Sequence, residues 1–178
     1  MGMLLADPRE VLKFVTLRPG YRVADFGAGS GAYTSVLLER IGTEGKVYAL
    51  DALPQSLERI RHSAEGSGKK CMTLNCEFES ALPMKENLLD LAILANTLHH
   101  VDPHARQSFV SELARVVVPG GEVLIVDWAG SFNNMGPARS MIVTPVDAVR
   151  LFRASGFNTG DMLPAGTHQY AFVATLPR

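Results

Sequence analysis

The chain has 178 residues, a length that suits one domain with a full hydrophobic core and is short for a two-domain enzyme. Its formal net charge of −1, with 47% hydrophobic and 20% charged residues, is typical of a soluble globular protein and gives no electrostatic reason to expect a nucleic-acid or membrane partner. We therefore expect residues 1–178 to form a single domain that acts on a small molecule.

The amino terminus, the apolar runs and the two cysteines predict a cytoplasmic protein that has no metal site. The amino terminus lacks the basic start and the long apolar stretch of a signal peptide, and no apolar run is long enough for a transmembrane helix. Cys71 and Cys76 lie in one predicted strand at an odd spacing, so their side chains are expected on opposite faces and not in a disulfide. We expect no metal site, and either a monomer or a homodimer.

Apolar runs alternate with helical patterns as far as about residue 128, which is typical of stacked β-α-β units. A leading helix is predicted over 7–17, because Asp7 can cap it and Pro8 suits its first position. Strands follow at 21–25, 46–50, 70–75, 89–95 and 122–127, helices at about 31–41, 54–65 and 104–117, and a turn at Pro119-Gly120-Gly121.

The pattern changes after residue 128. Residues 128–143 are rich in Gly, Ser, Asn and Pro and form a long connection, where a substrate would meet the protein. Thr144-Pro145 then begins a helix that is predicted to continue to Ala154. Two final strands, near 157–163 and 168–175, are predicted to form a hairpin around a turn at 164–166.

A glycine-rich turn follows the first strand, in the sequence Val23-Ala-Asp-Phe-Gly-Ala-Gly-Ser-Gly31, and Asp51 stands at the carboxyl end of the second. A strand, a glycine turn, a helix and a second strand that ends in an acid predict a site for a cofactor with a ribonucleoside. Gly27, Gly29 and Ala32 also satisfy the dinucleotide fingerprint, so the glycine spacing alone leaves NAD open.

Asp25 bears on which cofactor is bound. Two positions before the first glycine, its carboxylate would lie close to a pyrophosphate, where like charges oppose binding, whereas it would favour a cationic ammonium or sulfonium. Asp51 is placed to accept both ribose hydroxyls of either cofactor. The pair therefore favours a cationic methyl donor over a dinucleotide.

The motif Asp25-Phe-Gly27-Ala-Gly29-Ser-Gly31 resembles the Asp-x-Gly-x-Gly-x-Gly motif of the class I S-adenosylmethionine-dependent methyltransferases. Within that family the chain is most similar to small enzymes related to the ubiquinone and menaquinone biosynthesis methyltransferases. The resemblance implies an α/β fold of three layers, Rossmann-like, with a mostly parallel seven-stranded sheet that ends in an antiparallel hairpin. Further matching segments are Leu82-Pro83, Asp90-Leu-Ala-Ile-Leu, Asn96-Thr-Leu-His-His100, Leu113 to Gly121, Asp127-Trp128, Gly136-Pro137 and Ala154-Ser-Gly-Phe157.

The same resemblance implies that the cofactor is S-adenosyl-L-methionine. Asp25 would help to hold its amino group, Asp51 would bind its ribose, and the methyl group would lie near Asn96. An acid usually follows the third strand beside the adenine ring. Counting back from Leu82-Pro83 places Phe78 there, so which of Glu77, Phe78 and Glu79 contacts adenine is left open. The remaining implied contacts are the backbone of Phe26, Gly27, Ala28 and Gly29, and Ala52.

A sulfonium is already a strong electrophile, so in-line displacement requires mainly that the reacting atoms be aligned, and a dedicated base is not required. If the acceptor must lose a proton, the candidates are His99, His100 and Asp127. His99 and His100 are expected to point in different directions, with at most one facing the site. Asp127 could equally form a turn at the end of a strand.

The function predicted from the sequence is transfer of a methyl group from S-adenosylmethionine to a small-molecule acceptor by in-line displacement. Two alternatives come from other classes of protein. A cofactor-binding module without turnover, such as a sensor or an assembly partner, would keep the same pocket. An NAD-dependent oxidoreductase would use the same glycine spacing, although Asp25 and the terminal hairpin count against it.

Overall fold

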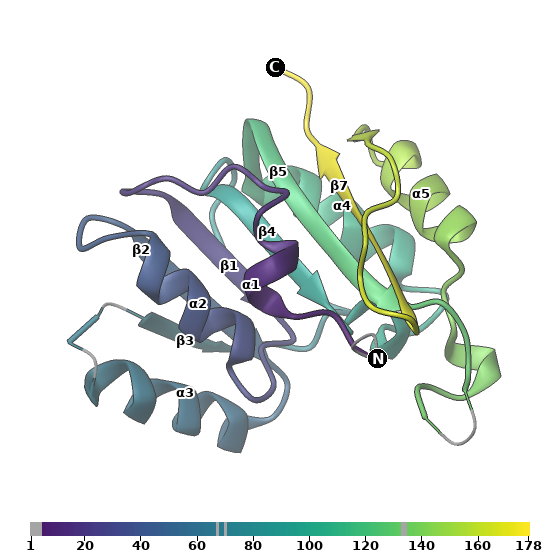
Figure 1. Ribbon diagram of the computed structural model, residues 1–178. Coiled ribbons are helices and arrows are strands. Elements are labelled where there is room, and N and C mark those ends of the chain that lie inside the picture. Colours follow the sequence, from purple (N-terminus) through teal and green to yellow (C-terminus); the bar gives the residue numbers. More distant parts are fainter. Residues whose placement is uncertain (1–4, 67, 70, 133–134) are drawn as a thin grey trace.

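The computed structural model describes residues 5–66, 68–69, 71–132 and 135–178, and a central sheet runs through it (Figure 1). Within these residues the sheet has seven strands in the order β3-β2-β1-β4-β5-β7-β6. The strands are β1 (Arg22–Phe26), β2 (Lys46–Asp51), β3 (Cys71–Asn75), β4 (Leu89–Ala95), β5 (Val117–Trp128), β6 (Asn158–Thr159) and β7 (Gln169–Thr175).

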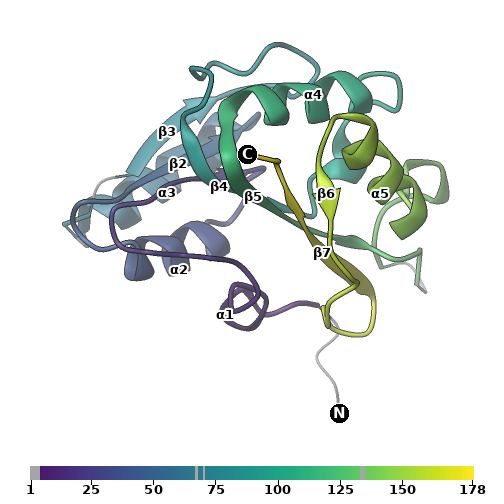
Figure 2. The same cartoon turned by 90° about the horizontal axis from the view of Figure 1, so that it is seen from above.

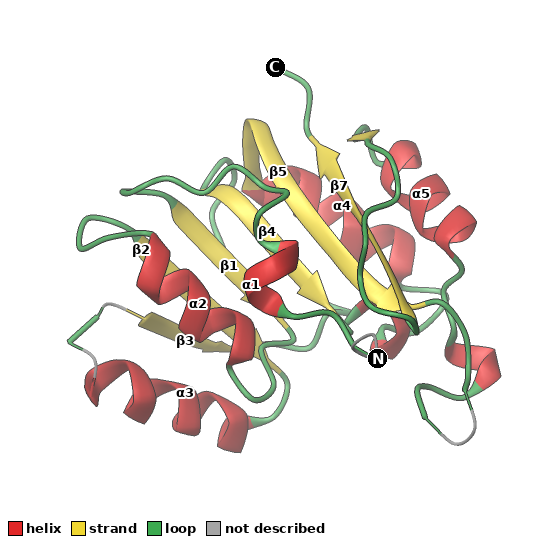
Figure 3. Ribbon diagram, in the orientation of Figure 1, coloured by secondary structure: helices red, strands yellow, loops and turns green. Residues whose placement is uncertain are grey.

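Helices cover both faces of the sheet, which gives three layers (Figures 2 and 3). One face carries α1 (Pro8–Val11), α2 (Ala32–Arg40) and α3 (Pro54–Gly66), and the other carries α4 (Arg106–Val116) and α5 (Pro145–Ala154). Two short 3-10 turns, η1 (Leu98–His100) and η2 (Arg139–Met141), follow β4 and precede α5. The predicted three-layer Rossmann-like fold is confirmed.

The central strands are apolar along their whole length because both of their faces are covered. In β4, Leu91 and Ile93 pack in the cluster that includes α1 and α2, while Ala92 and Leu94 pack in the cluster that includes α4 and α5. All four side chains are fully buried. The apolar run that predicted this strand is therefore continuous because alternate side chains pack into two separate hydrophobic clusters, one on each face of the sheet.

The topology defines where a ligand can bind. The first five strands pair in parallel, and β7 pairs antiparallel with both β5 and β6. From the adjacent strands β1 and β4, the chain continues to opposite sides of the sheet. In open α/β sheets such a switch point leaves a crevice at the carboxyl ends of the strands. The glycine turn after β1 lies at this crevice.

The leading helix predicted over 7–17 is wrong beyond Val11, where α1 ends. Asp7 caps the helix as predicted, since its side chain accepts a backbone hydrogen bond of 2.8 Å in the first turn. The chain then turns toward the sheet, where the backbone N–H of Thr16 donates to Glu122 at 2.7 Å. That long-range contact replaces the helical hydrogen bonds which the periodicity predicted.

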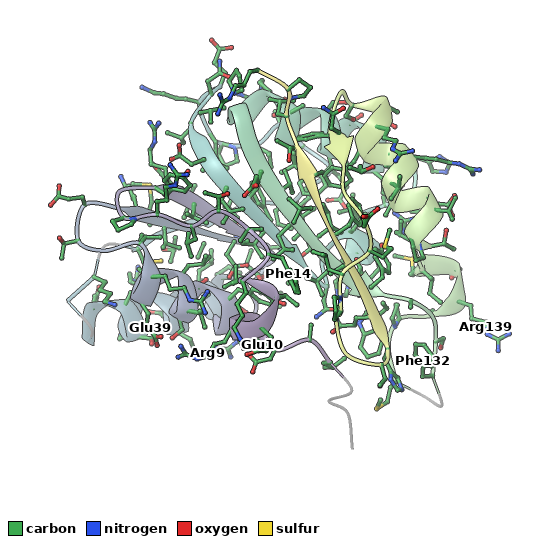
Figure 4. The ribbon with its side chains drawn as sticks, turned by 45° about the horizontal axis from the view of Figure 1, so that its top comes forward. Arg9, Glu10, Phe14, Glu39, Phe132 and Arg139 are labelled. Atoms are coloured by element: carbon green, nitrogen blue, oxygen red, sulfur yellow. The ribbon has the colours of Figure 1, made fainter. Side chains whose placement is uncertain are left out.

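An ion pair fixes α1 against the next helix. Arg9 lies beside Glu39 of α2 in Figure 4, and their charged atoms are 2.8 Å apart. Both side chains are about half exposed, so solvent screens this contact and it adds little to the stability of the protein. None of the helices among the described residues is long and apolar enough to cross a membrane.

The turn predicted at Pro119-Gly120-Gly121 is not a connection outside the sheet, because β5 already begins at Val117. Gly120 has a φ of +82° and its backbone N–H donates to Leu176 at 2.7 Å. The pairing register of β5 with β4 shifts just here. The Pro-Gly-Gly sequence therefore marks a bulge within a strand, a position where glycine is also favoured.

The carboxyl-terminal part agrees with the sequence in outline. The helix predicted from 145 to 154 is confirmed, and the Thr144 side chain accepts from the backbone N–H of Asp147. The strand predicted at 157–163 is reduced to β6, with one further bridge between Leu163 and Ala171. Residues 133–134 of the predicted loop, residue 70 of the third predicted strand and residues 1–4 lie outside the described residues.

Cys71 packs with the clusters beneath α2 and α3, whereas Cys76, one residue past β3, packs in the cluster on the opposite face. The two thiols therefore diverge, as their spacing predicts, and both are free. Burial raises the pKa of Cys71 to about 11 and also raises that of Cys76. Such thiols are poor nucleophiles at neutral pH.

Candidate active site

A cavity of about 560 Å³ opens at the carboxyl ends of β1, β2 and β4. Most of its wall comes from the glycine turn, from the residues after β2 and β3, and from the residues after β4. Its lining residues are Asp25, Gly27, Ala28, Gly29, Ser30, Ala32, Tyr33, Asp51, Ala52, Leu53, Ser56, Glu77, Phe78, Glu79, Ala95, Asn96, Thr97, His100 and Val101. Ten of the eleven predicted cofactor residues line it; Phe26 is instead fully buried in the hydrophobic core.

Asp51 holds the glycine turn. Its Oδ2 accepts the backbone N–H of Gly29 at 2.8 Å, and its Oδ1 accepts the backbone N–H of Leu53 at 2.8 Å. The residue is only 8% exposed. Each carboxylate oxygen can accept more than one hydrogen bond, so both oxygens keep capacity for a ligand in the cavity.

Asp25 lies deeper, at 2% exposure, on the penultimate position of β1. Its Oδ2 accepts the hydroxyl of Thr34 in α2 at 2.6 Å. Burial raises the pKa of Asp25 to about 6, because the charged form loses water, and the hydrogen bond from Thr34 opposes that rise. A buried carboxylate in this state favours a cationic partner.

The glycine turn is a cradle that a side chain would fill. Gly27 has a φ of +72°, and a Cβ built on it would clash with the Oγ1 atom of Thr97. Thr97 is held there because its hydroxyl donates to the carbonyl of Phe26 at 2.6 Å. Position 27 therefore requires glycine for conformation and for space.

The segment after β3 presents an aromatic ring between two acids. Phe78 stacks on Phe109 with ring centroids 5.0 Å apart and meets Phe26 edge-on, so its position is set by core packing. Glu79 accepts the backbone N–H of Asp102 at 3.3 Å. The exposed carboxylate of Glu77 accepts no hydrogen bond from the described residues.

Asn96 follows β4 and lines the cavity in a left-handed conformation, with a φ of +56°. Its Oδ1 accepts the side-chain amide of Gln169. The Oε1 atom of Gln169 in turn accepts the backbone N–H of Ala6 at 2.7 Å. The end of β4 is thus connected through β7 to the segment before α1.

A second cavity, of about 340 Å³, lies beside the first and shares His100 with it. Five of its seven lining residues come from 128–143, the segment predicted to meet a substrate. The lining residues are His99, His100, Trp128, Gly136, Pro137, Ala138 and Met141.

His99 is bound to Asp127 at two points. The ring Nδ1 lies 2.6 Å from Oδ1 of Asp127, and the backbone N–H of His99 donates to Oδ2 at 3.1 Å. Oδ1 of Asp127 also accepts the backbone N–H of Trp128 at 2.7 Å. Both side chains of the pair are buried, at 6% and 1% exposure.

Of the two histidines, His100 lines the first cavity, and both His99 and His100 line the second one. The tight 3-10 turn η1 sets their ring centroids 4.1 Å apart. Burial lowers the pKa of His100, and the neighbouring His99 lowers it further. His100 is therefore uncharged at neutral pH.

Several cavity residues were not predicted from the sequence, and they are Ser30, Tyr33, Leu53, Ser56, Thr97 and Val101. Tyr33 is the most informative: burial raises its pKa, and the charge of Asp25 raises it further. Thr97 directly follows a predicted site residue, yet its role depends on the close approach to Gly27, which no spacing reveals. The described residues contain no cluster of His, Cys, Asp and Glu that could hold a metal.

The chain is similar in sequence to a family of known proteins. A family model described as a methyltransferase domain matches residues 23–121, which is more than half of the chain. Demethylmenaquinone methyltransferase of Bacillus mycoides is 27% identical over 119 residues, covering 67% of this chain and 49% of the relative. The ubiquinone/menaquinone biosynthesis C-methyltransferase UbiE of Burkholderia multivorans is 28% identical over 128 residues, covering 72% and 51%. The chain thus spans about half the length of these curated relatives.

A solved structure is similar over nearly the whole chain. A SAM dependent methyltransferase from Aquifex aeolicus is 28% identical, with a TM-score of 0.86 over 97% of this chain and 90% of that one. The family model, the relatives and this fold agree with the motif that begins at Asp25. The chain therefore belongs to the methyltransferase-domain family and has the fold of the S-adenosylmethionine-dependent class I enzymes.

Proposed function

We propose that the protein transfers a methyl group from S-adenosylmethionine to a small-molecule acceptor by in-line displacement. The observation that carries this proposal is that Asp25 and Asp51 are both buried against the same 560 Å³ cavity, on either side of a glycine cradle. A buried carboxylate favours a cation and a strand-end carboxylate favours a ribose, and S-adenosylmethionine contains both.

The residues of the cavity fit that cofactor part by part. Asp25 would attract the ammonium group, and Asp51 would accept the ribose hydroxyls with its remaining lone pairs. The free carboxylate of Glu77 is the better placed of the two flanking acids to accept the adenine amino group, because Glu79 already accepts a backbone N–H. Phe78 and the exposed Leu53 supply apolar surface for the ring.

A dinucleotide fits less well. Its pyrophosphate would lie at the amino end of α2, close to the buried Asp25. The carboxylate has only the hydroxyl of Thr34 as a side-chain partner, so no cation in the described residues offsets its charge there. Like charges in a buried site oppose binding strongly.

The choice of a small molecule as acceptor rests on the second cavity. Its volume of about 340 Å³ falls at the lower end of the range for small-molecule sites. It adjoins the first cavity through His100, so a molecule in one could reach a group in the other. The net charge of −1 also gives no reason to expect a polyanionic partner.

When bound, the cofactor supplies an electrophilic methyl group, and the chain's task is then alignment and exclusion of water. Asn96 and Thr97, which follow β4, line the first cavity. Residues 136–138 and Met141 line the second cavity, and Arg106 holds Met141 by donating to the carbonyls of Val101 and Met141. Rigid supports of this kind favour an in-line approach.

Calorimetric titration of the protein with S-adenosylmethionine, S-adenosylhomocysteine and NAD tests the proposal. We expect the first two to bind and NAD not to bind; tight binding of NAD alone would contradict the proposed cofactor. Formation of S-adenosylhomocysteine with a library of metabolites then separates an enzyme from a binding module. Cofactor binding without turnover of any acceptor would favour the module.

A further inference from the structure

The orientation of His99 leaves one ring nitrogen available. Its Nδ1 lies against the carboxylate of Asp127, which can only accept, so Nδ1 is the donor and, in the neutral tautomer that this contact selects, Nε2 is the nitrogen with the lone pair. Nε2 has no hydrogen-bond partner among the described residues, and no buried side-chain nitrogen or oxygen among them is left without one. Nε2 is therefore not sealed in the core, and the cavity that His99 lines is the second one.

None of the residues that line that cavity is an aspartate, a glutamate, a lysine or an arginine. Trp128, Pro137 and Met141 provide apolar surface, and His100 is uncharged at neutral pH. Asp127 is shielded behind His99 at 1% exposure. Arg139, a charged residue between Ala138 and Met141, points away from the body of the protein (Figure 4). A charged acceptor would lose water here without gaining a counter-ion, which is costly.

A neutral imidazole nitrogen in an uncharged cavity has a specific use. It can accept a hydrogen bond from a neutral donor and remove the proton as that donor becomes a nucleophile. An ammonium group would find no carboxylate, and a carboxylate acceptor has no proton to give. A hydroxyl on an apolar body can donate a hydrogen bond to this lone pair, while the apolar body packs against the apolar side chains of the cavity.

We propose that the acceptor is an uncharged molecule with a hydroxyl on an apolar, ring-sized body, and that His99 is the catalytic base for methylation at that oxygen. This inference rests on the proposed function above. The hydroxyl oxygen forms the new bond to the methyl carbon as the bond from that carbon to sulfur breaks. The electron pair goes to sulfur, and the hydroxyl proton goes to Nε2 of His99 and then to water. Asp127 is a positioning residue.

Trp128 allows acceptor binding to be measured directly, because it is the only tryptophan in the chain. Protein loaded with S-adenosylhomocysteine would be titrated with para-ethylphenol, its methyl ether and para-ethylbenzoate, and the fluorescence of Trp128 recorded. We expect the phenol to bind about tenfold more tightly than the ether, since only the phenol can donate to Nε2, and the benzoate to bind least. Equal binding of phenol and ether, tightest binding of the benzoate, or no quenching by any of them would overturn the inference.

Transfer is tested with methyl-labelled S-adenosylmethionine, and NMR of the product identifies the methylated atom. A methoxy product supports the inference. A product methylated on carbon or nitrogen overturns it while the proposed function stands, and the absence of cofactor binding would instead contradict the proposed function.

Two variants separate catalysis from structure. His99→Gln keeps a donor for Asp127 but lacks the basic nitrogen, so kcat should fall at least about a hundredfold with cofactor affinity unchanged. His62→Gln, which replaces an exposed histidine on α3, is the matched control and should leave kcat unchanged. An unchanged kcat in His99→Gln would overturn the assignment. Asp127→Asn should lower kcat without weakening binding of the cofactor.

Discussion

The backbone N–H of Gly29 donates to Oδ2 of Asp51 across the gap between β1 and β2, at 2.8 Å. The strand-end acid thus shapes the glycine turn before any ligand binds. Its other oxygen accepts the backbone N–H of Leu53, so both oxygens have directed contacts. A binding site whose polar groups are already oriented loses less free energy to ordering when its ligand binds.

Asp51→Asn should weaken binding of S-adenosylmethionine by roughly 1.5–3 kcal/mol. An amide can accept on one side only, so its NH₂ group would oppose either Gly29 or Leu53. Asp90→Asn is the matched control, because Asp90 also accepts a backbone N–H, from Arg22 at 2.8 Å, but lies at the opposite end of the sheet. Calorimetry of both variants should show a loss of affinity in the first alone; unchanged affinity in Asp51→Asn would remove it from the ribose role.

Cofactor affinity should depend on pH through Asp25. Its pKa is about 6 in the free protein, so it takes up a proton below that pH. An ammonium group requires the carboxylate, so the dissociation constant for S-adenosylmethionine should rise as the pH falls through about 6, approaching tenfold per pH unit. Titration across this range checks the slope, and Asp25→Asn should bind weakly with no such slope.

The same residue should reduce the stability of the free protein. Because the pKa of Asp25 is raised from 3.8 to about 6, its stabilising contribution is complete below 3.8 and is lost as the pH rises through 6. Asp25→Asn, which still accepts from Thr34, should therefore be more stable than the parent at alkaline pH, by up to about 3 kcal/mol. Urea unfolding at alkaline and acidic pH measures this gain; a destabilised variant at both would contradict it.

The sequence predicted the elements whose signals are local. Strands such as β4 are continuous apolar runs, and α5 has a proline and a capping threonine at its start, so both were located closely. The failures are at α1, where the Thr16 contact with Glu122 ends the helix, and at Pro119, where a bulge imitates a loop. Both features depend on contacts with strands that are distant in sequence, and hydrophobic periodicity carries no information about such contacts.

The site residues fall into the same two groups, those with a local sequence signal and those whose placement depends on the tertiary structure. Motif spacing placed Asp25 and Asp51, because the carboxyl ends of adjacent parallel strands always meet at one edge. The pairing of His99 with Asp127 spans 28 residues and depends on the tight turn η1 after β4. Adjacent histidines were expected to diverge, and only the turn geometry brings both against one cavity.

Gly27→Ala should destabilise the protein more than an ordinary glycine substitution in a turn. The positive φ alone costs about 1–2 kcal/mol, and the clash with Thr97 adds about 1–3 kcal/mol. Gly20→Ala is the control, since Gly20 has a φ of +86° but a Cβ at this position would have nothing within 4 Å. Thr97→Ala should recover part of the loss in a double variant. Equal destabilisation by both glycine substitutions, measured by urea unfolding, would show that the close approach to Thr97 is unimportant.

Gly136→Ala should displace residues 136–138, which line the second cavity. A Cβ at Gly136 would lie 2.8 Å from an indole carbon of Trp128, and its φ is +88°. Because the residue packs on the ring face, either the segment or the indole must move, and we expect acceptor affinity to fall at least about tenfold with cofactor affinity unchanged. Gly130→Ala, whose Cβ would make an ordinary contact with Phe132 at 3.4 Å, is the control in the same segment. Fluorescence of Trp128 reports the displacement, and an unaltered spectrum with unaltered acceptor affinity would contradict the role of this segment.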